Sequence, residues 1–230
     1  MTASERLTLE DAIELLPKYS SWMNTILDRI ETIRPISKGM DVLEIGAAQG
    51  RGLAGLVERG LNAKGVEPWD EAREVAQKLA AHLDMDFDIR AGAAEDIPFE
   101  DASFDLVLAT SVMEHVSDLE QSLREIYRVL RPGGVFWFNS ASAMCPKQGE
   151  IRGFPAFGWY PDPIKKRIMR WAMDARPELV GHTRAPAYHW WTNRNAEKRL
   201  RAAGFEPVEM DTSEFLKSGG SVFCMKLMFW

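Results

Sequence analysis

Residues 42–52 have the sequence VLEIGAAQGRG, in which a short apolar run ends beside an acidic residue and gives way to glycines and alanines. This pattern predicts a buried parallel strand, a tight turn without bulky side chains and the start of a helix. Such a turn lets a ligand lie against bare backbone at the carboxyl end of a sheet, where the N–H groups of the helix face it. We therefore expect a site for a nucleotide or nucleoside at this turn.

Hydrophobic periodicity predicts strands that alternate with helices over most of the chain. The predicted strands are residues 40–45, 63–67, 87–90, 104–109 and 135–139, and the predicted helices are residues 51–59, 71–83, 118–130 and 193–203. Residues 206–211 and 222–230 are expected to form an antiparallel hairpin. Together these elements predict a Rossmann-like α/β fold: a seven-stranded, mostly parallel sheet with an antiparallel last strand and helices on both faces.

The length of 230 residues and the hydrophobic content of 46% favour a single domain over residues 1–230. Residues 1–35 are expected to form N-terminal helices that Pro17 interrupts. Residues 144–191, between the fifth strand and the next helix, are expected to form an α-helical and aromatic insertion, which we call the cap. The sequence thus predicts one domain with two additional segments: the N-terminal helices before the first strand and the cap after the fifth strand.

The charge of the chain is unevenly distributed. The net charge is −6, yet residues 145–201 hold 12 Lys and Arg against 5 Asp and Glu, a local balance of +7 that leaves −13 for the rest. Two interpretations stand at this point: solvated charges over buried tryptophans, or a cap that offers cations and aromatic faces to an anionic or planar substrate. The acidic balance and the lack of an extended basic stripe argue against nucleic acid as a partner.

The expected compartment is the cytoplasm. No run approaches the ~20 apolar residues of a membrane span, and the first residues do not resemble a signal peptide. Cys145 and Cys224 lie far apart without metal-type spacing, so we expect free thiols in a reducing environment.

The glycine-rich turn has the spacing Glu44-x-Gly46-x-Ala48-x-Gly50. A nicotinamide-type G-x-G-x-x-G would need glycine at position 48, which argues against an NAD-dependent oxidoreductase. The spacing resembles the E-x-G-x-G-x-G loop of class I S-adenosylmethionine-dependent methyltransferases, with alanine for the middle glycine. Four further segments resemble the same family: GAAEDIPFEDASFD at residues 92–105, SVMEHV at 111–116, RVLRPGG at 128–134 and AAGFE at 202–206.

The resemblance implies S-adenosyl-L-methionine as the cofactor and assigns roles along the chain. The loop would be braced by Glu44, and the cofactor would be approached closely by the backbone of Gly46, Ala48 and Gly50. The ribose would be held by Glu67, and the adenine would be bordered by Ala94 and Glu95. The floor under the sulfonium would be lined by Thr110 and Ser111. Glu67 also stands at the end of the second predicted strand, where a carboxylate accepts hydrogen bonds from ribose hydroxyls in dinucleotide folds.

Methyl transfer requires alignment of the acceptor, exclusion of water and, for a protonated acceptor, a base. His115 is the candidate base because it follows the fourth predicted strand; its alternative is structural packing. Ser111 occupies the position of one expected ligand in the metal-binding members of the family, so we expect no metal. The candidate substrate contacts are Tyr19, Trp22, Trp159, His189 and Trp190, for which packing is again the alternative.

The sequence therefore predicts a methyltransferase that acts on a small or medium organic acceptor with an acidic or phosphate group. A lipid, polyprenyl or glycan acceptor is an alternative because the cap combines large apolar groups with cations. A regulatory protein that binds S-adenosylmethionine without catalysis is another. An aminopropyl transferase is disfavoured because Thr110 and Ser111 stand where such an enzyme places an acidic catalytic residue.

Overall fold

The computed structural model describes residues 8–141, 143, 150–180, 185–208 and 226–229. Its sheet has the strand order β3-β2-β1-β4-β5-β7-β6. The strands are β1 (Asp41–Ile45), β2 (Asn62–Val66), β3 (Asp88–Arg90), β4 (Phe104–Thr110), β5 (Leu130–Asn139), β6 (Glu206–Val208) and β7 (Lys226–Phe229). The first five are parallel, whereas β7 runs antiparallel to both β5 and β6. The predicted α/β fold with a mostly parallel sheet is confirmed.

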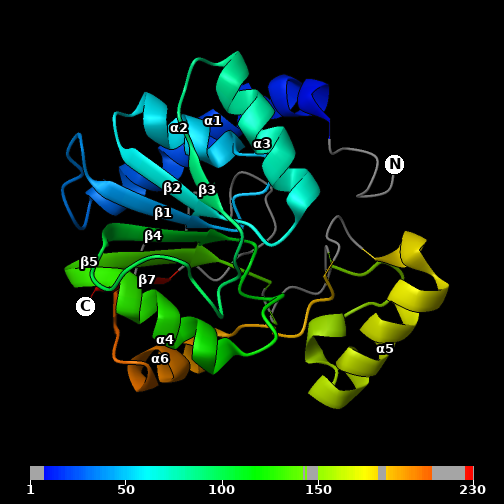
Figure 1. The fold of residues 1–230 in the computed structure, drawn as a ribbon. Coiled ribbons are helices and arrows are strands. Elements are labelled where there is room, and N and C mark those ends of the chain that lie inside the picture. The colour runs from blue at the N-terminus through cyan, green and yellow to red at the C-terminus, as the bar shows by residue number, and fades with distance from the viewer. Residues whose placement is uncertain (1–7, 142, 144–149, 181–184, 209–225, 230) are drawn as a thin grey trace.

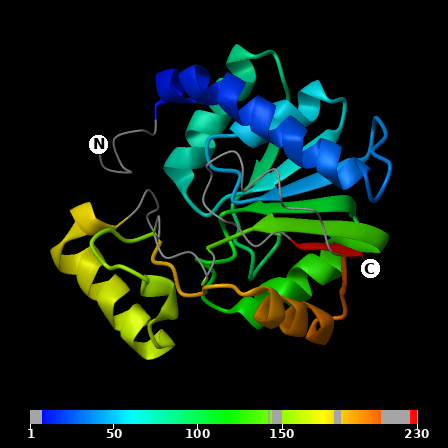
Figure 2. The same ribbon diagram turned by 180° about the vertical axis from the view of Figure 1, so that it is seen from behind.

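Helices cover both faces of the sheet. In Figures 1 and 2, α1 (Leu9–Glu31), α2 (Arg51–Glu58) and α3 (Asp70–His82) lie on one face, and α4 (Leu119–Val129) and α6 (Asn193–Ala202) lie on the other. The central strands are buried on both sides because each face carries a helical layer. One apolar core therefore lies under α1 and α2, and a second lies under α4 and α6.

The N-terminal segment differs from the prediction. We expected helices on either side of Pro17, but α1 continues through this residue as one helix. Thr8 caps it, since the Asp11 N–H donates to Thr8 Oγ1 at 3.1 Å. Proline removes one backbone donor, yet the following turns bury Met23 and Ile26 completely. This burial against the sheet stabilises the helix beyond the proline.

The described part of the cap forms a small unit with its own core. It contains η2 (Phe157–Trp159), α5 (Asp162–Ala175) and η3 (Pro177–Leu179). The buried residues of this core are Ala141, Ile151, Phe157, Met169, Ala172, Ala187 and Trp190. Figures 1 and 2 place α5 beyond the carboxyl-terminal edge of the parallel strands, apart from both helical layers. Cys145 and Cys224 lie outside the described residues, so the expected free thiols remain a prediction.

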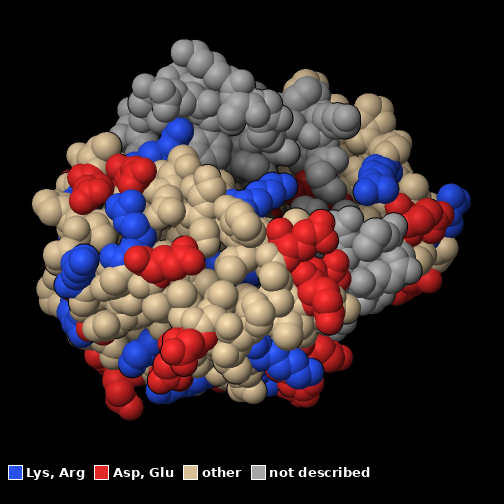
Figure 3. Space-filling model, turned by 90° about the horizontal axis from the view of Figure 1, so that it is seen from above, with Lys and Arg blue, Asp and Glu red and all other residues tan. Residues whose placement is uncertain are grey.

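None of the helices in the described part of the chain combines the length and the apolar character that crossing a bilayer requires. On the face that Figure 3 presents, the coloured Lys and Arg side chains are interspersed with Asp and Glu side chains. The described part of this face therefore offers a mixture of charges to solvent.

Candidate active site

The loop after β1 has three left-handed residues in alternation. Gly46, Ala48 and Gly50 have φ angles of +70°, +47° and +75°. A Cβ on Gly46 would lie 2.5 Å from Val112 Cγ2, so glycine is required there. Ala48 adopts the conformation that the family pattern gives to glycine, at a cost of about 1 kcal/mol. The alanine thus preserves the shape of the loop.

Glu44 lies beneath the start of α2. Its side chain is 4% exposed, and a Cβ on Gly52 would lie 2.1 Å from Glu44 Oε1. Burial raises the pKa of Glu44 to about 8, although nearby Arg51 and the Leu53 N–H favour the charged form. Glu44 Oε2 is buried and accepts no hydrogen bond within the described part of the chain. The expected bracing role is therefore supported by its position, and one polar atom remains to receive a donor.

Glu67 joins the loops after β1 and β2. Its side chain is 4% exposed; Oε2 accepts from the Ala48 N–H at 2.9 Å, and Oε1 accepts from the Trp69 N–H at 3.1 Å. The Gly46 and Ala47 N–H groups both donate to Val66 O, at 2.9 and 3.1 Å, which fixes the same two loops. The Glu67 carboxylate therefore lies between the two loops that follow β1 and β2.

Tyr19 and Trp22 occupy different environments, although both were predicted to contact substrate. The guanidinium of Arg51, the first residue of α2, lies 4.0 Å from the centre of the Tyr19 ring. Burial lowers the pKa of Arg51. Trp22 instead packs between α1 and the sheet, with its ring 6.5 Å from that of Trp137. Tyr19 thus borders the loop, whereas Trp22 has a packing role.

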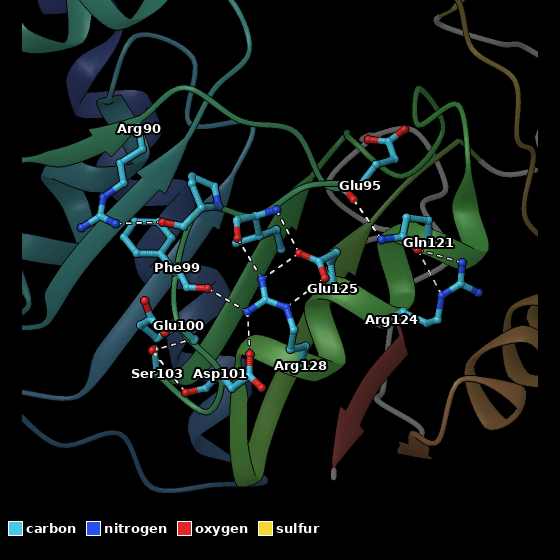
Figure 4. Close-up of polar contacts among 12 residues, drawn as sticks. Arg90, Glu95, Phe99, Glu100, Asp101, Ser103, Gln121, Arg124, Glu125 and Arg128 are labelled. Atoms are coloured by element: carbon cyan, nitrogen blue, oxygen red, sulfur yellow. Dashed lines mark hydrogen bonds and ion pairs between the residues drawn. The ribbon is translucent and has the colours of Figure 1, made fainter.

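Ala94 and Glu95 lie in a turn near the first residues of α4. Ala94 is buried in the core at 2% exposure. Glu95 Oε1 accepts from the Ser117 N–H at 2.6 Å and from Ser117 Oγ at 2.9 Å. Figure 4 shows the contact in which Glu95 O accepts from Gln121 Nε2. The carboxylate of Glu95 is therefore committed to the start of α4, and an adenine contact would rely on the backbone of this turn.

Two arginines hold the segment that follows this turn, a contact that the sequence did not predict. Arg128 of α4 donates to Ile97 O, Phe99 O and the carboxylates of Glu125 and Asp101 (Figure 4). From the other side, Arg90 donates to Pro98 O and stacks on the Phe99 ring at 4.1 Å. These contacts fix residues 97–101 relative to β3 and α4. Hydrophobic periodicity predicted the helix over residues 118–130 but not the partners of Arg128.

The end of β4 is tied to the end of β5. Thr110 pairs with Asn139 in the parallel ladder. The next residue, Ser111, is left-handed with φ +54°, and its N–H donates to Asn139 Oδ1 at 2.8 Å. Asn139 is 2% exposed, so this hydrogen bond lies in the interior. The predicted floor residues therefore stand at the carboxyl-terminal edge, and a strained backbone holds them there.

His115 lies in the turn that follows, where its N–H donates to Val112 O at 2.8 Å and its ring is partly buried. Its neighbour Glu114 is 1% exposed and accepts from Ser140 Oγ at 2.6 Å. Burial raises the pKa of Glu114 to about 7, while the Ser140 hydrogen bond opposes this shift. The buried pairing of Glu114 with a residue after β5 was not predicted from the sequence.

The returning segment of the cap is attached to this turn. The Tyr188 and His189 N–H groups donate to Glu114 O at 2.7 and 3.1 Å, and His189 Nε2 donates to Val116 O at 3.0 Å. Burial and nearby cations lower the pKa of His189, which favours its neutral form. His189 is therefore bonded to the turn that carries the candidate base, and its contact with the acceptor remains a prediction. No three metal-ligating side chains gather within the described residues.

The two tryptophans predicted as substrate contacts differ in exposure. Trp159 is 63% exposed at the end of η2, so its ring is accessible to a ligand. Trp190 is only 6% exposed; its ring packs against Phe157 and lies 4.5 Å from Lys165 Nζ. Trp190 therefore packs in the core of the cap, and its predicted contact with substrate remains a prediction.

Comparison with known proteins connects this geometry to one family. Residues 43–138 match the family described as "Methyltransferase domain". A probable S-adenosylmethionine-dependent methyltransferase of Mycolicibacterium smegmatis is 41% identical over 130 residues, 56% of this chain and 49% of that protein. The ubiquinone biosynthesis O-methyltransferase of Azorhizobium caulinodans is 35% identical over 104 residues, 45% of this chain and 41% of that protein. The chain spans about half the length of these curated relatives.

Solved structures agree at the level of the fold. The phosphoethanolamine N-methyltransferase 2 of Haemonchus contortus, in complex with phosphomonomethylethanolamine and S-adenosylhomocysteine, superposes with a TM-score of 0.60 at 21% identity. The match covers 85% of this chain and 40% of that one. The matched domain, the fold and the loop after β1 agree with one another: residues 43–138 of this chain are similar to the methyltransferase domain of S-adenosylmethionine-dependent methyltransferases.

Proposed function

We propose that this protein transfers a methyl group from S-adenosylmethionine to a small or medium organic acceptor that carries an acidic or phosphate group. The observation that carries the proposal is the loop after β1: three left-handed residues expose its backbone, and Glu67 closes it from the side of β2. The residues present suit the cofactor, since the buried Oε2 of Glu44 leaves one polar atom without a donor at this loop.

Each group of the site would have a separate task. S-adenosylmethionine, when bound, supplies a methyl group that is already activated for transfer. Gly46, Ala48 and Gly50 allow close approach of backbone, and Glu67 accepts the ribose hydroxyls. Thr110 and Ser111 form the floor. His115 takes the proton from the attacking acceptor atom where that atom carries one, and the cap excludes water.

The acceptor class is inferred from the cap. Lys166 and Arg167 are exposed on α5, and Trp159 offers an accessible ring after the sheet edge. Cations and an aromatic face favour an acceptor with negative charge. The relatives include an O-methyltransferase, and the structural neighbour is an N-methyltransferase, so the atom methylated in this chain is left open by the family. The alternative of a lipid, polyprenyl or glycan acceptor would be identified if the protein methylated such a compound in an acceptor screen.

Isothermal titration with S-adenosylmethionine, S-adenosylhomocysteine and NAD tests the cofactor. We expect affinities on the order of micromolar for the two sulfur compounds and no binding of NAD. A screen of phosphorylated and carboxylated acceptors with labelled S-adenosylmethionine then tests the reaction. Binding of NAD alone would overturn the proposal. Tight binding of both sulfur compounds without turnover of any acceptor would favour the regulatory alternative.

A further inference from the structure

One stripe of α5 exposes apolar side chains that the proposed reaction does not use. Ile164 is 49% exposed, Trp171 is 46% exposed, and Ile168 is partly exposed between them. Exposed Ala175 continues the stripe, so its successive members are four, three and four residues apart. This spacing is the pattern by which one helix packs along a second helix. In Figures 1 and 2 neither helical layer of the sheet lies against α5, and the stripe is accessible to a helix of another molecule.

Two opposite charges border this stripe on its solvent side. Arg167 and Asp174 are both exposed, and their separation of seven residues, nearly two helical turns, places them on the same flank. Neither side chain forms an ion pair within the part of the chain that the structure describes. The other flank is formed by Lys165 and Ala172, which are buried toward the core of the cap. The solvent-side flank therefore presents one cation and one anion that are available to a partner.

The apolar stripe is complementary to that of a second copy of the chain in antiparallel orientation. When two α5 helices cross a two-fold axis in this way, Ile168 lies opposite the partner's Trp171. In the same register Ile164 lies opposite the partner's Ala175, a large side chain against a small one. The symmetry repeats each contact, so all four residues of the stripe are covered in both copies.

This register also pairs the two charges between the copies. Arg167 lies opposite the partner's Asp174, and the two-fold axis repeats the contact, so both charges of each copy gain a partner of opposite sign. A flank with one charge of each sign matches a second copy better than it matches a surface of a single sign. An anionic membrane would attract Arg167 but repel Asp174. Lys166 does not compensate for this repulsion, because it lies on the opposite side of the helix.

We propose that the protein forms a two-fold dimer through antiparallel α5 helices, in which the apolar stripe is buried and reciprocal Arg167–Asp174 pairs between the copies set the register. Because α5 has only 14 residues, this interface is smaller than that of a standard stable complex. We therefore expect reversible association with a dissociation constant on the order of 10 µM or weaker. The proposal does not rest on the methyl transfer proposed above.

Sedimentation equilibrium of the full chain over a series of concentrations tests the dimer. R167D places an aspartate opposite the partner's Asp174, and D174R places an arginine opposite the partner's Arg167. Each variant alone should therefore associate at least about tenfold more weakly than the wild type. An equimolar mixture of the two variants should associate like the wild type, because every charge again faces one of opposite sign. The control K166D makes the same change of charge on the far side of α5 and should also associate like the wild type.

The variant W171S tests the apolar part of the interface. Its association should be at least about 30-fold weaker, because tryptophans near the centre of an interface contribute much of the binding energy. Circular dichroism and thermal unfolding verify the fold of each variant. A wild type that is monomeric at every concentration would overturn the proposal, as would equal losses in R167D and K166D. A dimer that persists in both charge variants, or a mixture of them that stays monomeric although both are folded, would also overturn it.

Discussion

The carboxylate of Glu67 accepts a hydrogen bond from the Ala48 N–H at 2.9 Å, and this contact joins the two loops that flank the candidate cofactor site. Ala48 is the residue at which the chain departs from the glycine pattern of the methyltransferases that it resembles. Its left-handed φ of +47° directs its N–H toward the acid from the next strand. Alanine in place of glycine at position 48 is therefore compatible with the same loop geometry, and the hydrogen bond to Glu67 stabilises this loop.

Replacement of Glu67 by alanine is expected to weaken binding of S-adenosylhomocysteine. Hydrogen bonds to a charged group contribute about 1.5–3 kcal/mol, so the affinity should fall roughly 10- to 150-fold in isothermal titration. Glu67→Gln should lose less, because the amide oxygen still accepts one hydrogen bond. The control is Glu58→Ala, which removes an exposed acid at the other end of α2. Unchanged affinity of Glu67→Ala would refute the ribose assignment.

The pair Glu44 and Gly52 gives a prediction about stability. A Cβ at position 52 would lie 2.1 Å from Glu44 Oε1, and the Glu44 side chain is buried. Gly52→Ala should therefore cost about 1–3 kcal/mol in urea unfolding. In the background Glu44→Ala the same change should be neutral or favourable, since alanine exceeds glycine in helix propensity by about 1 kcal/mol. Additive effects in this double-mutant cycle would contradict the contact.

Local patterns predicted the parts of the site that depend on neighbouring residues. The run VLEIG indicates a strand and a glycine turn, because a buried strand favours apolar residues and a left-handed φ favours glycine. The ends of β1 and β3 fall within one residue of the prediction. Glu67 followed from its place after the second strand. α1 was predicted as interrupted because local rules count the donor lost at Pro17 but not the burial of Met23 and Ile26.

Contacts between residues that are distant in the sequence could not be predicted from local patterns. Ser140 and Glu114 are 26 positions apart, and their pairing requires β4 and β5 to be adjacent in the sheet. Trp190 resembled a substrate contact because an aromatic residue beside a histidine has the same composition in a pocket and in a core. Only the packing of Phe157 and Lys165 against its ring distinguishes the two.

Arg128 is expected to stabilise the segment that follows the adenine-side turn. Hydrogen bonding to Glu125 raises the pKa of Arg128, and the same guanidinium binds the carbonyls of Ile97 and Phe99. Arg128→Ala should lower the free energy of unfolding by about 1–3 kcal/mol. Arg124→Ala is a matched control on the same helix, because Arg124 contacts only the Gln121 side chain among the described residues (Figure 4). An equal loss of unfolding free energy in both variants would show that helix propensity is responsible, and not the contacts of Arg128 with residues 97–101.

Glu114 should make stability depend on pH. Burial raises its pKa from 4.5 to about 7, so the folded state binds more protons than the unfolded state between these values. Its contribution to stability is therefore greatest in acid and is lost as the pH rises from about 4.5 to about 7, by about 3 kcal/mol. Urea unfolding at about pH 5 and about pH 8 measures the difference. Glu114→Gln retains an acceptor for Ser140 and should reduce this difference by that amount; an unchanged difference would contradict a buried acid.

His115 is expected to affect turnover without affecting cofactor affinity. A positioned base contributes about 10²- to 10⁴-fold when the acceptor must lose a proton. His115→Ala should therefore bind S-adenosylhomocysteine like the wild type and slow turnover of an acceptor found by the screen. His82→Ala, at an exposed position at the end of α3, is the matched control and should be fully active. The loss should disappear with an acceptor that is already deprotonated, because no proton is then removed. Equal turnover of His115→Ala and the wild type on every acceptor would make His115 a residue of the turn alone.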